Sequence, residues 1–344
     1  GVEKRMAVPC NLSRLLAALL LALVVTLVMG CNPQAAQSTF DVGGPVARMQ
    51  LDLFKIVLGL AVLVFVLVEG VLLFVIIRFR RRARQGIPSQ THGNTRLEVA
   101  WTLAPALVLL VIAIPTGATQ FAVSNPPSAP DVEVRVVAHQ WWWEFKYPDL
   151  GVVTANEMYI PVGKVVNLTL ESQDVIHSFW VPNLAGKMDM IPNRINSMWL
   201  QADEAKTYQG QCAEFCGIAH AHMRFLVIAV TQPEFDAWVQ GQKSPPPALS
   251  GEAERGAALF DQRGCASCHL IQGTAAKGQF GPNLTLFGSR TSVAAGTLEN
   301  DAEGKNLARW LHDPQLVKPG TKMPNMKLGD EDIAALVAYL KSLK

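Results

Sequence analysis

Two long apolar runs in the first third of the chain constrain its fold more than any other feature. Residues 56–77 form a stretch with a single charge, Glu69, and residues 99–121 form an uncharged stretch. About 20 consecutive apolar residues in a helix cross the hydrocarbon core of a bilayer. Because every backbone polar group must be satisfied within lipid, each run is expected to be one spanning α-helix. We therefore expect a transmembrane hairpin over residues 51–122.

The segment between these runs predicts the orientation of the hairpin. It contains six arginines: Arg78, Arg80, Arg81, Arg82, Arg84 and Arg96. Short loops rich in Lys and Arg remain in the cytoplasm, so this segment is expected to be cytoplasmic. Both outer ends of the hairpin, and everything after residue 121, are then extracytoplasmic.

The first thirty residues have the pattern of an export signal. Arg14 precedes an apolar run over residues 15–29, which is too short to span a bilayer comfortably. The run ends in the tetrapeptide VMGC, which resembles a bacterial lipoprotein cleavage box. We expect residues 1–30 to be removed as a signal peptide and Cys31 to carry lipid; a retained third membrane helix is the alternative. Met6 is a candidate for the first translated residue.

The extracytoplasmic part begins with a stiff linker, NPPSAP, at residues 125–130. Apolar and polar residues then alternate over 132–138, and further β-rich runs follow at 165–170, 198–200 and 225–230. Short strands at this spacing are typical of a β-sandwich.

One loop, residues 212–223, combines two thiols, two imidazoles and a thioether. Soft sulfur ligands together with imidazole select copper or zinc, and a single electron-transfer copper takes two His, one Cys and a weak Met. The additional Cys is explained if both thiolates bridge two metals, which leaves four terminal positions. The groups that would fill them are His220, Met223, the backbone carbonyl of Glu214 and one His from elsewhere, for which His177 is the best donor. A structural zinc on Cys212, Cys216, His220 and a fourth ligand is the alternative, but zinc needs neither the Met nor further ligands.

The spacing of these residues resembles the binuclear CuA site in subunit II of haem-copper cytochrome c oxidases. The shared pattern is Cys, three residues, Cys, three, His, two, Met, with an upstream His and a Glu between the cysteines. The resemblance implies a cupredoxin-like β-sandwich over residues 131–242, whose last two strands are joined by the loop. It implies these copper ligands: His177, Cys212, Glu214, Cys216, His220 and Met223. It also implies that the carboxylate of Glu214 holds a Mg²⁺ shared with subunit I.

An aromatic stretch at residues 139–143, HQWWW, carries the same resemblance. Its first Trp, Trp141, matches the residue that lies between a docked cytochrome c and the copper centre in the family, although a dense aromatic cluster is more often core packing. The chain departs from the family pattern at Trp142, where Tyr is usual, and at Asn193, where Gly is usual. The second departure is expected to alter a turn near the contact with subunit I.

Two carboxylates lie in or beside the predicted membrane helices, where charge is expensive and often functional. Residues 98–105 resemble the second helix of the family, in which the residue matching Glu98 lies near the cytoplasmic mouth of a proton path into subunit I. An interfacial position beside the arginines is the other interpretation of Glu98. Glu69 is the weaker candidate for such a role.

A second Pro-rich linker, residues 243–250, precedes a C-terminal domain at residues 251–344. Residues 252–262 are predicted to form a short helix, and a haem c attachment motif follows it. In this motif Cys265 and Cys268 supply the thioether bonds and His269 the proximal ligand. A thioredoxin-like redox pair is the alternative for the two cysteines, but it leaves His269 and a downstream Met unexplained.

The surroundings of this motif resemble a small class I cytochrome c. The resemblance rests on GPNL at 281–284, Trp310-Leu311, KPGTKMP at 318–324 and a closing helix with an apolar stripe over 333–343. It implies a covalently bound haem c whose distal ligand is Met323 rather than Met326. Since both Cys pairs must then supply free sulfur to a metal or a haem, we expect no disulfide.

Charge differs between the two extracytoplasmic parts. Residues 131–242 carry 7 basic and 13 acidic residues, a net charge of −6, whereas residues 251–344 carry 11 and 10, a net charge of +1. Neither value suggests nucleic acid as a partner. Long-range electrostatic attraction between the two parts should therefore be weak. The short Pro-rich linker compensates, because it keeps each part near the other at an effective concentration on the order of mM.

Together these features predict a two-helix membrane hairpin, a cupredoxin-like β-sandwich and a small all-α class I cytochrome c domain. The resemblance implies a subunit of a bacterial cytochrome c oxidase in the plasma membrane, with both metal-binding domains on the periplasmic side. Expected partners are subunit I, subunit III and a soluble cytochrome c or similar donor. Two alternatives remain: an electron-transfer subunit of a nitric oxide reductase-like complex, and a membrane-anchored copper or haem carrier that works without subunit I.

Overall fold

The computed structural model describes residues 10–29, 35–80, 90 and 92–344. Cys31, the residue expected to carry lipid, lies outside the described residues, as do Arg81, Arg82 and Arg84. Helix α1 (Cys10–Met29) contains the apolar run near the N-terminus.

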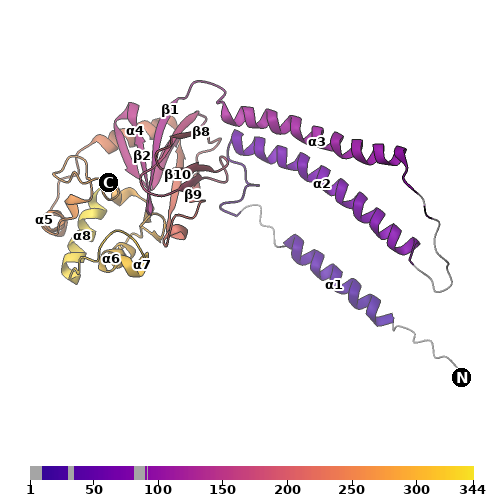
Figure 1. Ribbon diagram of the computed structural model, residues 1–344. Helices are drawn as coiled ribbons and strands as arrows, with labels where there is room; N and C mark the ends of the chain where they lie inside the picture. The colour runs from indigo at the N-terminus through magenta and orange to yellow at the C-terminus, as the bar shows by residue number, and fades with distance from the viewer. Residues whose placement is uncertain (1–9, 30–34, 81–89, 91) are drawn as a thin grey trace.

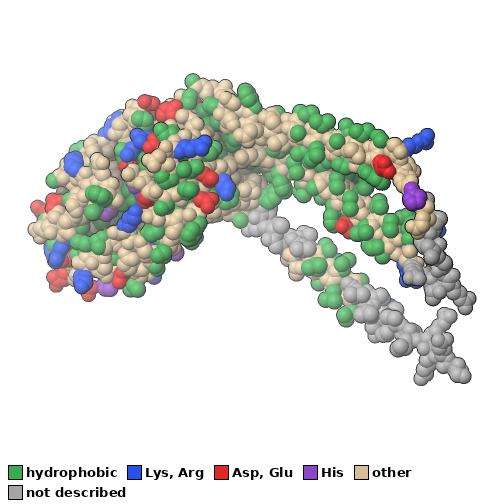
Figure 2. Space-filling model, in the orientation of Figure 1, with side chains coloured by type: hydrophobic (Ala, Val, Ile, Leu, Met, Phe, Trp, Pro, Cys, Tyr) green, Lys and Arg blue, Asp and Glu red, His purple; other side chains and the backbone are tan. Residues whose placement is uncertain are grey.

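Two long helices, α2 (Pro45–Arg78) and α3 (Thr95–Ser124), run side by side and project from the β-rich part of the chain (Figure 1). Both are long and apolar enough to cross a membrane. Hydrophobic side chains cover their surfaces (Figure 2), as expected for helices that face lipid. The C-terminal end of α2 and the N-terminal end of α3 lie remote from the β-rich domain, so both outer ends of the hairpin lie on the domain's side (Figure 1).

Helix α2 begins at Pro45, six residues before the start of the hairpin expected from hydropathy. Its first turn packs against protein rather than lipid, because Val46 and Ala47 are buried and the Ala47 N–H donates to the Leu184 carbonyl (3.1 Å). Arg48 pairs with Asp203 of the β-rich domain (2.7 Å). The hairpin is therefore anchored directly to the domain that it carries.

The middle of the chain folds into two five-stranded sheets that share one core. The first sheet has the order β3-β2-β1-β5-β8, from β1 (Val132–His139), β2 (Trp142–Tyr147), β3 (Val152–Ala155), β5 (Val166–Ser172) and β8 (Asn196–Leu200). The second has the order β4-β10-β9-β6-β7, from β4 (Glu157–Pro161), β6 (His177–Trp180), β7 (Met188–Met190), β9 (Thr207–Cys212) and β10 (Arg224–Val230). The four strands predicted from the sequence correspond to β1, β5, β8 and β10, and the predicted β-sandwich is confirmed.

Aromatic side chains fill the core between the two sheets. The rings of Trp143 and Phe225 lie 4.8 Å apart, and those of Phe179 and Phe225 lie 4.7 Å apart, measured between centroids. The indole N–H of Trp143 also donates to the Met223 carbonyl (3.4 Å), which belongs to the predicted metal loop. The loop therefore lies on a closely packed aromatic base.

Helix α4 (Gln232–Lys243) follows the sandwich, and the sequence analysis did not predict it. The Thr231 N–H donates to the Glu234 carboxylate (2.9 Å), which forms a capping box, and Pro233 occupies the first turn. The apolar side of the helix packs on the sandwich, where Trp238 stacks on Tyr159. Because α4 extends to Lys243, the second Pro-rich linker begins at Ser244 rather than at residue 243.

The C-terminal domain is a small helical unit with its own core. Its helices are α5 (Glu252–Gln262), α6 (Lys305–His312), α7 (Pro314–Val317) and α8 (Asp330–Ser342), with short strands β11 (Ser292–Val293) and β12 (Leu298–Glu299). Helix α5 has the predicted bounds, and the predicted stripe of α8 faces the core. Helix α5 packs closely against α8 at Gly256, where a Cβ atom would lie 2.0 Å from the Ala335 carbonyl oxygen. Only glycine fits at this crossing.

The C-terminal domain packs directly on the β-sandwich domain, on the side away from the membrane hairpin (Figure 1). Contacts between the two include a backbone hydrogen bond from Arg224 to Ala295 (3.0 Å) and one from the Asn283 side chain to the Val153 carbonyl (2.7 Å). The tether of residues 244–250 is therefore supplemented by a direct interface, which net charge alone did not predict.

Candidate metal and haem centres

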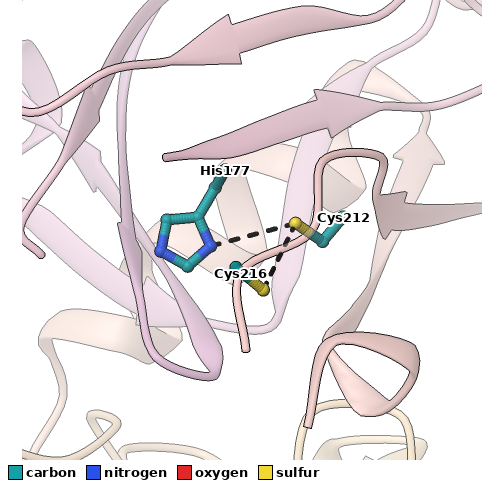
Figure 3. A group of neighbouring side chains, drawn as sticks. All are labelled: His177, Cys212 and Cys216. Atoms are coloured by element: carbon teal, nitrogen blue, oxygen red, sulfur yellow. Dashed lines mark hydrogen bonds between the residues drawn. The ribbon is translucent and has the colours of Figure 1, made fainter. Parts of the chain in front are cut away.

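Three of the predicted copper ligands, His177, Cys212 and Cys216, come together where strands β6 and β9 of the second sheet begin and end (Figure 3). His177 is the first residue of β6, Cys212 is the last residue of β9, and pairing of these strands places the two side chains close together. The Cys212 sulfur lies 3.8 Å from the His177 Nδ1 and 3.7 Å from the Cys216 sulfur. All three residues are buried.

The other three predicted ligands surround the same pair of sulfurs. The Cys216 sulfur lies 3.5 Å from the His220 Nδ1 and 3.8 Å from the Met223 sulfur, and the Cys212 sulfur lies 3.2 Å from the Glu214 carbonyl oxygen. His222, two residues after His220, is exposed instead. A turn of 3₁₀-helix over His220–His222 separates the two imidazoles in this way.

The geometry of the sulfur pair suits shared metals. The four cysteines whose side chains are described are all free thiols: Cys212, Cys216, Cys265 and Cys268. A separation of 3.7 Å is far beyond a disulfide bond of about 2.05 Å. Two sulfurs bound to the same metal, each at about 2.3 Å, lie no more than about 4.6 Å apart. The Cys212 and Cys216 sulfurs are therefore close enough to bridge two metals. Two thiols, two imidazoles, a thioether and a carbonyl form a soft donor set that fits copper.

The thiol pair is electrostatically prepared for metal binding. Hydrogen bonding between the two sulfurs lowers the pKa of Cys212 and raises the pKa of Cys216, so Cys212 is the more readily deprotonated of the two. Since the thiolate is the form that binds metals, this shift favours metal binding by Cys212.

A carboxylate behind His177 fixes the orientation of its ring. The Asp174 carboxylate accepts from the His177 Nε2 (2.8 Å) and from the Gln140 backbone N–H (2.7 Å). Burial alone would raise the pKa of Asp174, but hydrogen bonds from His177, Gln140 and Val175 hold this pKa well below its usual range. With its Nε2 proton donated to Asp174, His177 presents the lone pair of Nδ1 to the sulfurs, which is the usual arrangement behind a metal-binding His. Asp174 was not among the predicted site residues, although its position three residues before His177 was a usable signal.

Trp141 lies between the sulfur cluster and the C-terminal domain. Its indole N–H donates to the Cys216 carbonyl (3.0 Å), and the side-chain amide of Gln140 donates to the same oxygen (2.8 Å). Trp141 is only 9% exposed. Gly217 has φ +117°, and a Cβ there would lie 2.9 Å from the Trp141 ring, so glycine is required for this close contact.

A cavity of about 390 Å³ opens between the C-terminal domain and Trp141. All four predicted haem residues line it: Cys265, Cys268, His269 and Met323. Much of the remaining lining is apolar: Phe260, Leu284, Leu307, Leu311, Leu336 and Leu340. A mostly apolar cavity of this size is typical of a cofactor site, and its residues fit a covalently attached haem c.

The proximal side of the cavity is arranged for a neutral, directed imidazole. The His269 Nδ1 donates to the Pro282 carbonyl (2.8 Å), which leaves the Nε2 lone pair for a metal, and burial lowers the pKa of His269. A Cβ at Gly281 would lie 2.6 Å from the ring. The imidazole is thus held between a carbonyl and a glycine.

Two methionines line the cavity, and their environments differ. Met323 packs against the core of the C-terminal domain, whereas Met326 is 37% exposed. We expect Met323→His to lower the reduction potential of the haem by on the order of 0.1 V, because a thioether ligand raises it, and Met326→Leu to leave it nearly unchanged. A redox titration of haem absorbance measures both, and the opposite pattern would assign the ligand to Met326.

The remaining predicted residues lie away from these centres. Glu98 is in the first turn of α3, at the end of the hairpin remote from the β-sandwich domain, and its carboxylate accepts from the Asn94 N–H (3.1 Å). This contact supports the helix start whatever further role Glu98 has. Glu69 lines an apolar hollow between α2 and α3. The Glu214 side chain is exposed, although its carbonyl faces the sulfurs.

Comparison with known proteins matches three successive parts of the chain. A model of the cytochrome c oxidase subunit II transmembrane domain matches residues 29–117, and one of its periplasmic domain matches residues 151–230. A cytochrome c model matches residues 253–344. Cytochrome c oxidase subunit 2 of Alkalihalophilus pseudofirmus is 40% identical over 335 residues, which are 94% of this chain and 96% of the relative. The chain belongs to the cytochrome c oxidase subunit II family.

Other members and neighbours of the cytochrome c oxidase subunit II family differ in how much of the chain they match. Cytochrome c oxidase subunit 2 of Bacillus subtilis is 38% identical and covers 95% of this chain and 97% of its own length. Quinol oxidase subunit 2 of the same species is 33% identical but covers 70% of this chain and 77% of its own length. A crystal structure of the periplasmic domain of subunit II of cytochrome oxidase from Bradyrhizobium japonicum covers 34% of this chain and 96% of its own, at 32% identity and a TM-score of 0.33.

Family membership confirms the predicted order of membrane hairpin, β-sandwich and cytochrome c domain. The chain is therefore a membrane protein and a subunit of a haem-copper oxidoreductase complex.

Proposed function

We propose that the chain is the subunit that receives electrons in a respiratory cytochrome c oxidase. Electrons would pass from a soluble donor, a cytochrome c or similar protein, through haem c and a binuclear copper centre to subunit I. There O₂ is reduced and protons are translocated. The observation that carries this function is the sulfur pair of Cys212 and Cys216, 3.7 Å apart and ringed by imidazole, thioether and carbonyl donors, with Trp141 between it and the haem cavity.

A cytochrome rather than a quinol is favoured as the source of electrons. Relatives named cytochrome c oxidase subunit 2 cover 94–95% of this chain, whereas those named quinol oxidase subunit 2 cover 68–70%. The chain has a cytochrome c domain at residues 253–344 with all four predicted haem residues at one cavity. A haem at this position would be the natural recipient of electrons from a soluble redox protein.

The residues of the chain have distinct tasks in this scheme. His177, Cys212, Glu214, Cys216, His220 and Met223 would hold the copper centre, and Cys265, Cys268, His269 and Met323 the haem. Bound copper and haem would each take up and release one electron at a time. Asp174 and the Pro282 carbonyl orient the two imidazoles, and burial of the sulfur pair excludes water, so little rearrangement need accompany electron transfer.

Further roles follow from the same proposal. The exposed carboxylate of Glu214 is free to hold a Mg²⁺ at the contact with subunit I while its carbonyl serves copper. Glu98 would mark the entrance of a proton path, and Cys31 would carry lipid. The copper and haem domains, residues 131–242 and 251–344, would lie on the periplasmic side of a bacterial plasma membrane, with subunit III as a further partner.

Purification in mild detergent tests this function against its alternatives. We expect subunit I to copurify, two copper atoms and one haem c per chain, and O₂ uptake with a reduced cytochrome c. Copurification with a complex that consumes nitric oxide instead of O₂ would identify the reductase alternative. A chain that carries copper and haem but no other subunit would indicate an independent carrier.

A further inference from the structure

The interface between the β-sandwich domain and the C-terminal domain buries two charged side chains. Among the described residues, Glu157 (1% exposed) and Lys318 (3% exposed) are the Asp, Glu, Lys or Arg residues that are buried. Glu157 belongs to the β-sandwich domain and Lys318 to the C-terminal domain, and each makes contacts across the interface. Charged side chains are rarely buried unless they have fixed partners. The contact between the two domains is therefore a stable interface and not a transient one.

Lys318 joins the two domains through its ammonium group. The residue directly follows α7, and its Nζ donates to the Trp141 carbonyl (2.7 Å) in the β-sandwich domain. The same Nζ donates to the Ala294 carbonyl (3.1 Å) in its own domain. A single side chain therefore ties the β11–β12 region of the C-terminal domain to the backbone of Trp141.

This tie lies where the two proposed redox sites approach each other. Both Lys318 and Trp141 line the haem cavity, and the Trp141 ring donates to the Cys216 carbonyl. Two residues after Lys318, Gly320 comes so close that a Cβ would lie 3.2 Å from Ile218 and 3.6 Å from the Trp141 ring. Lys318 thus fixes the backbone of the residue whose ring spans the gap between haem cavity and sulfur cluster.

The rest of the interface holds the domains in the same relative position. Glu157 accepts from the Thr291 N–H (2.9 Å) and from its hydroxyl (3.0 Å). At the rim, Lys322 pairs with Asp174 (3.3 Å), but the Lys322 side chain is largely exposed, so this pair contributes little. The buried contacts of Lys318 and Glu157 are therefore polar anchors of the interface, together with the hydrogen bonds of Asn283 and Arg224.

The Lys318 side chain is shielded from bulk solvent. Burial lowers the pKa of Lys318 to about 7. An uncharged amine still carries N–H donors, so the contact with Trp141 does not require the charged form. What the site requires is a long side chain that ends in a hydrogen-bond donor.

We propose that Lys318 is a positioning residue, which seats the C-terminal domain on Trp141 and thereby fixes the relative placement of the haem and copper sites. This role rests on the proposed function, since it serves electron transfer between the two sites. Glu157 and Thr291 secure the other side of the same interface.

Hydrogen–deuterium exchange of the holo subunit, resolved to single amides, measures the docking directly. The Arg224 N–H donates to Ala295 and the Thr291 N–H to Glu157, so both amides should exchange only when the domains separate. The Leu226 N–H donates to Asn156 within the β-sandwich domain and is the internal control. Without the two hydrogen bonds from the Lys318 Nζ, Lys318→Met should lower the protection of Arg224 and Thr291 by a factor of about ten to a hundred, and leave Leu226 unchanged.

Matched variants separate positioning from general damage. Lys318→Arg keeps a long cationic donor and should restore part of the protection, whereas Lys305→Met removes an exposed lysine of the same domain and should change nothing. If Lys318→Met fails to fold, Lys318→Gln, which keeps donors on a shorter side chain, is scored in the same way. Unchanged protection of Arg224 and Thr291 in either folded variant overturns the proposal.

Flash-induced oxidation of the haem provides a second readout in the intact oxidase. Positioning by Lys318 predicts slower electron transfer in Lys318→Met and partial recovery in Lys318→Arg, with copper content, haem content and both reduction potentials unchanged. A rate equal to wild type in Lys318→Met would count against it. Absence of copper or haem from the wild-type chain would instead overturn the proposed function, so the two failures are distinguishable.

Discussion

Replacing Cys216 with serine is expected to give a subunit that keeps its haem but holds no copper and delivers no electrons to the oxidase. The Cys216 sulfur is the centre of the cluster, with contacts to the Cys212 sulfur, the His220 Nδ1 and the Met223 sulfur. A serine hydroxyl is a hard, protonated group that does not replace a bridging thiolate. Removal of a residue that only hydrogen-bonds to a metal ligand already lowers metal affinity by about 10- to 100-fold. Removal of a bridging ligand itself should lower it further.

Copper analysis, haem absorbance and O₂ uptake measure the effect of Cys216→Ser. The matched control is His222→Asn, which removes an imidazole from the same loop but at an exposed position that does not face the sulfurs. The control should keep both copper atoms, whereas His220→Asn should lose them. Full copper content in Cys216→Ser, or loss of copper in His222→Asn, would contradict the proposed ligand set.

The haem motif and the metal loop could be recognised in the sequence because their ligands are local. Cys212 to Met223 lie within one loop, and Cys265 to His269 lie within five residues, so spacing alone constrains their geometry. The membrane helices were recognisable for a similar reason, since length and apolarity are properties of one segment. Helix α5 and the buried stripe of α8 followed from helical periodicity within a single element.

Of the features that were not predicted, some depend on contacts between distant segments and others had a local signal in the sequence. Asp174 orients His177 from only three residues away, but its hydrogen bond depends on the turn that precedes β6. Helix α4 carries a capping box, a local signal that was overlooked. The early start of α2 depends on burial of Val46 against the β-sandwich domain, which hydropathy does not register.

The interface between the domains shows most clearly why net charge is an incomplete guide. Values of −6 and +1 predict weak long-range attraction, and the tether was expected to compensate. The structure instead joins the domains through short-range hydrogen bonds, several of them to backbone carbonyls such as those of Trp141 and Val153. Contacts of this kind depend on shape and burial, and a sum over formal charges does not contain them.

Trp141→Phe is expected to slow electron transfer from the haem to the copper centre while copper content stays intact. Phenylalanine keeps an aromatic ring but lacks the indole N–H that donates to the Cys216 carbonyl, so the contact between cavity and cluster is lost. A displacement of about 1 Å in a reacting pair can cost on the order of a hundredfold in rate, and we expect a loss of at least about tenfold here. Trp238→Phe, a substitution at an aromatic residue that stacks on Tyr159 away from this contact, is the matched control.

The same flash experiment, carried across a salt series, separates docking by buried contacts from docking by surface charge. Raising ionic strength from about 0.01 to about 1 M shortens the Debye length from about 30 to about 3 Å, which screens exposed pairs such as Lys322 with Asp174. Because Lys318 and Glu157 are buried, the internal rate should change little over this range. Delivery by a strongly basic, untethered cytochrome should instead fall steeply. A steep salt dependence of the internal step would show that surface charge holds the domains together, and a wild-type rate in Trp141→Phe would place the electron path elsewhere.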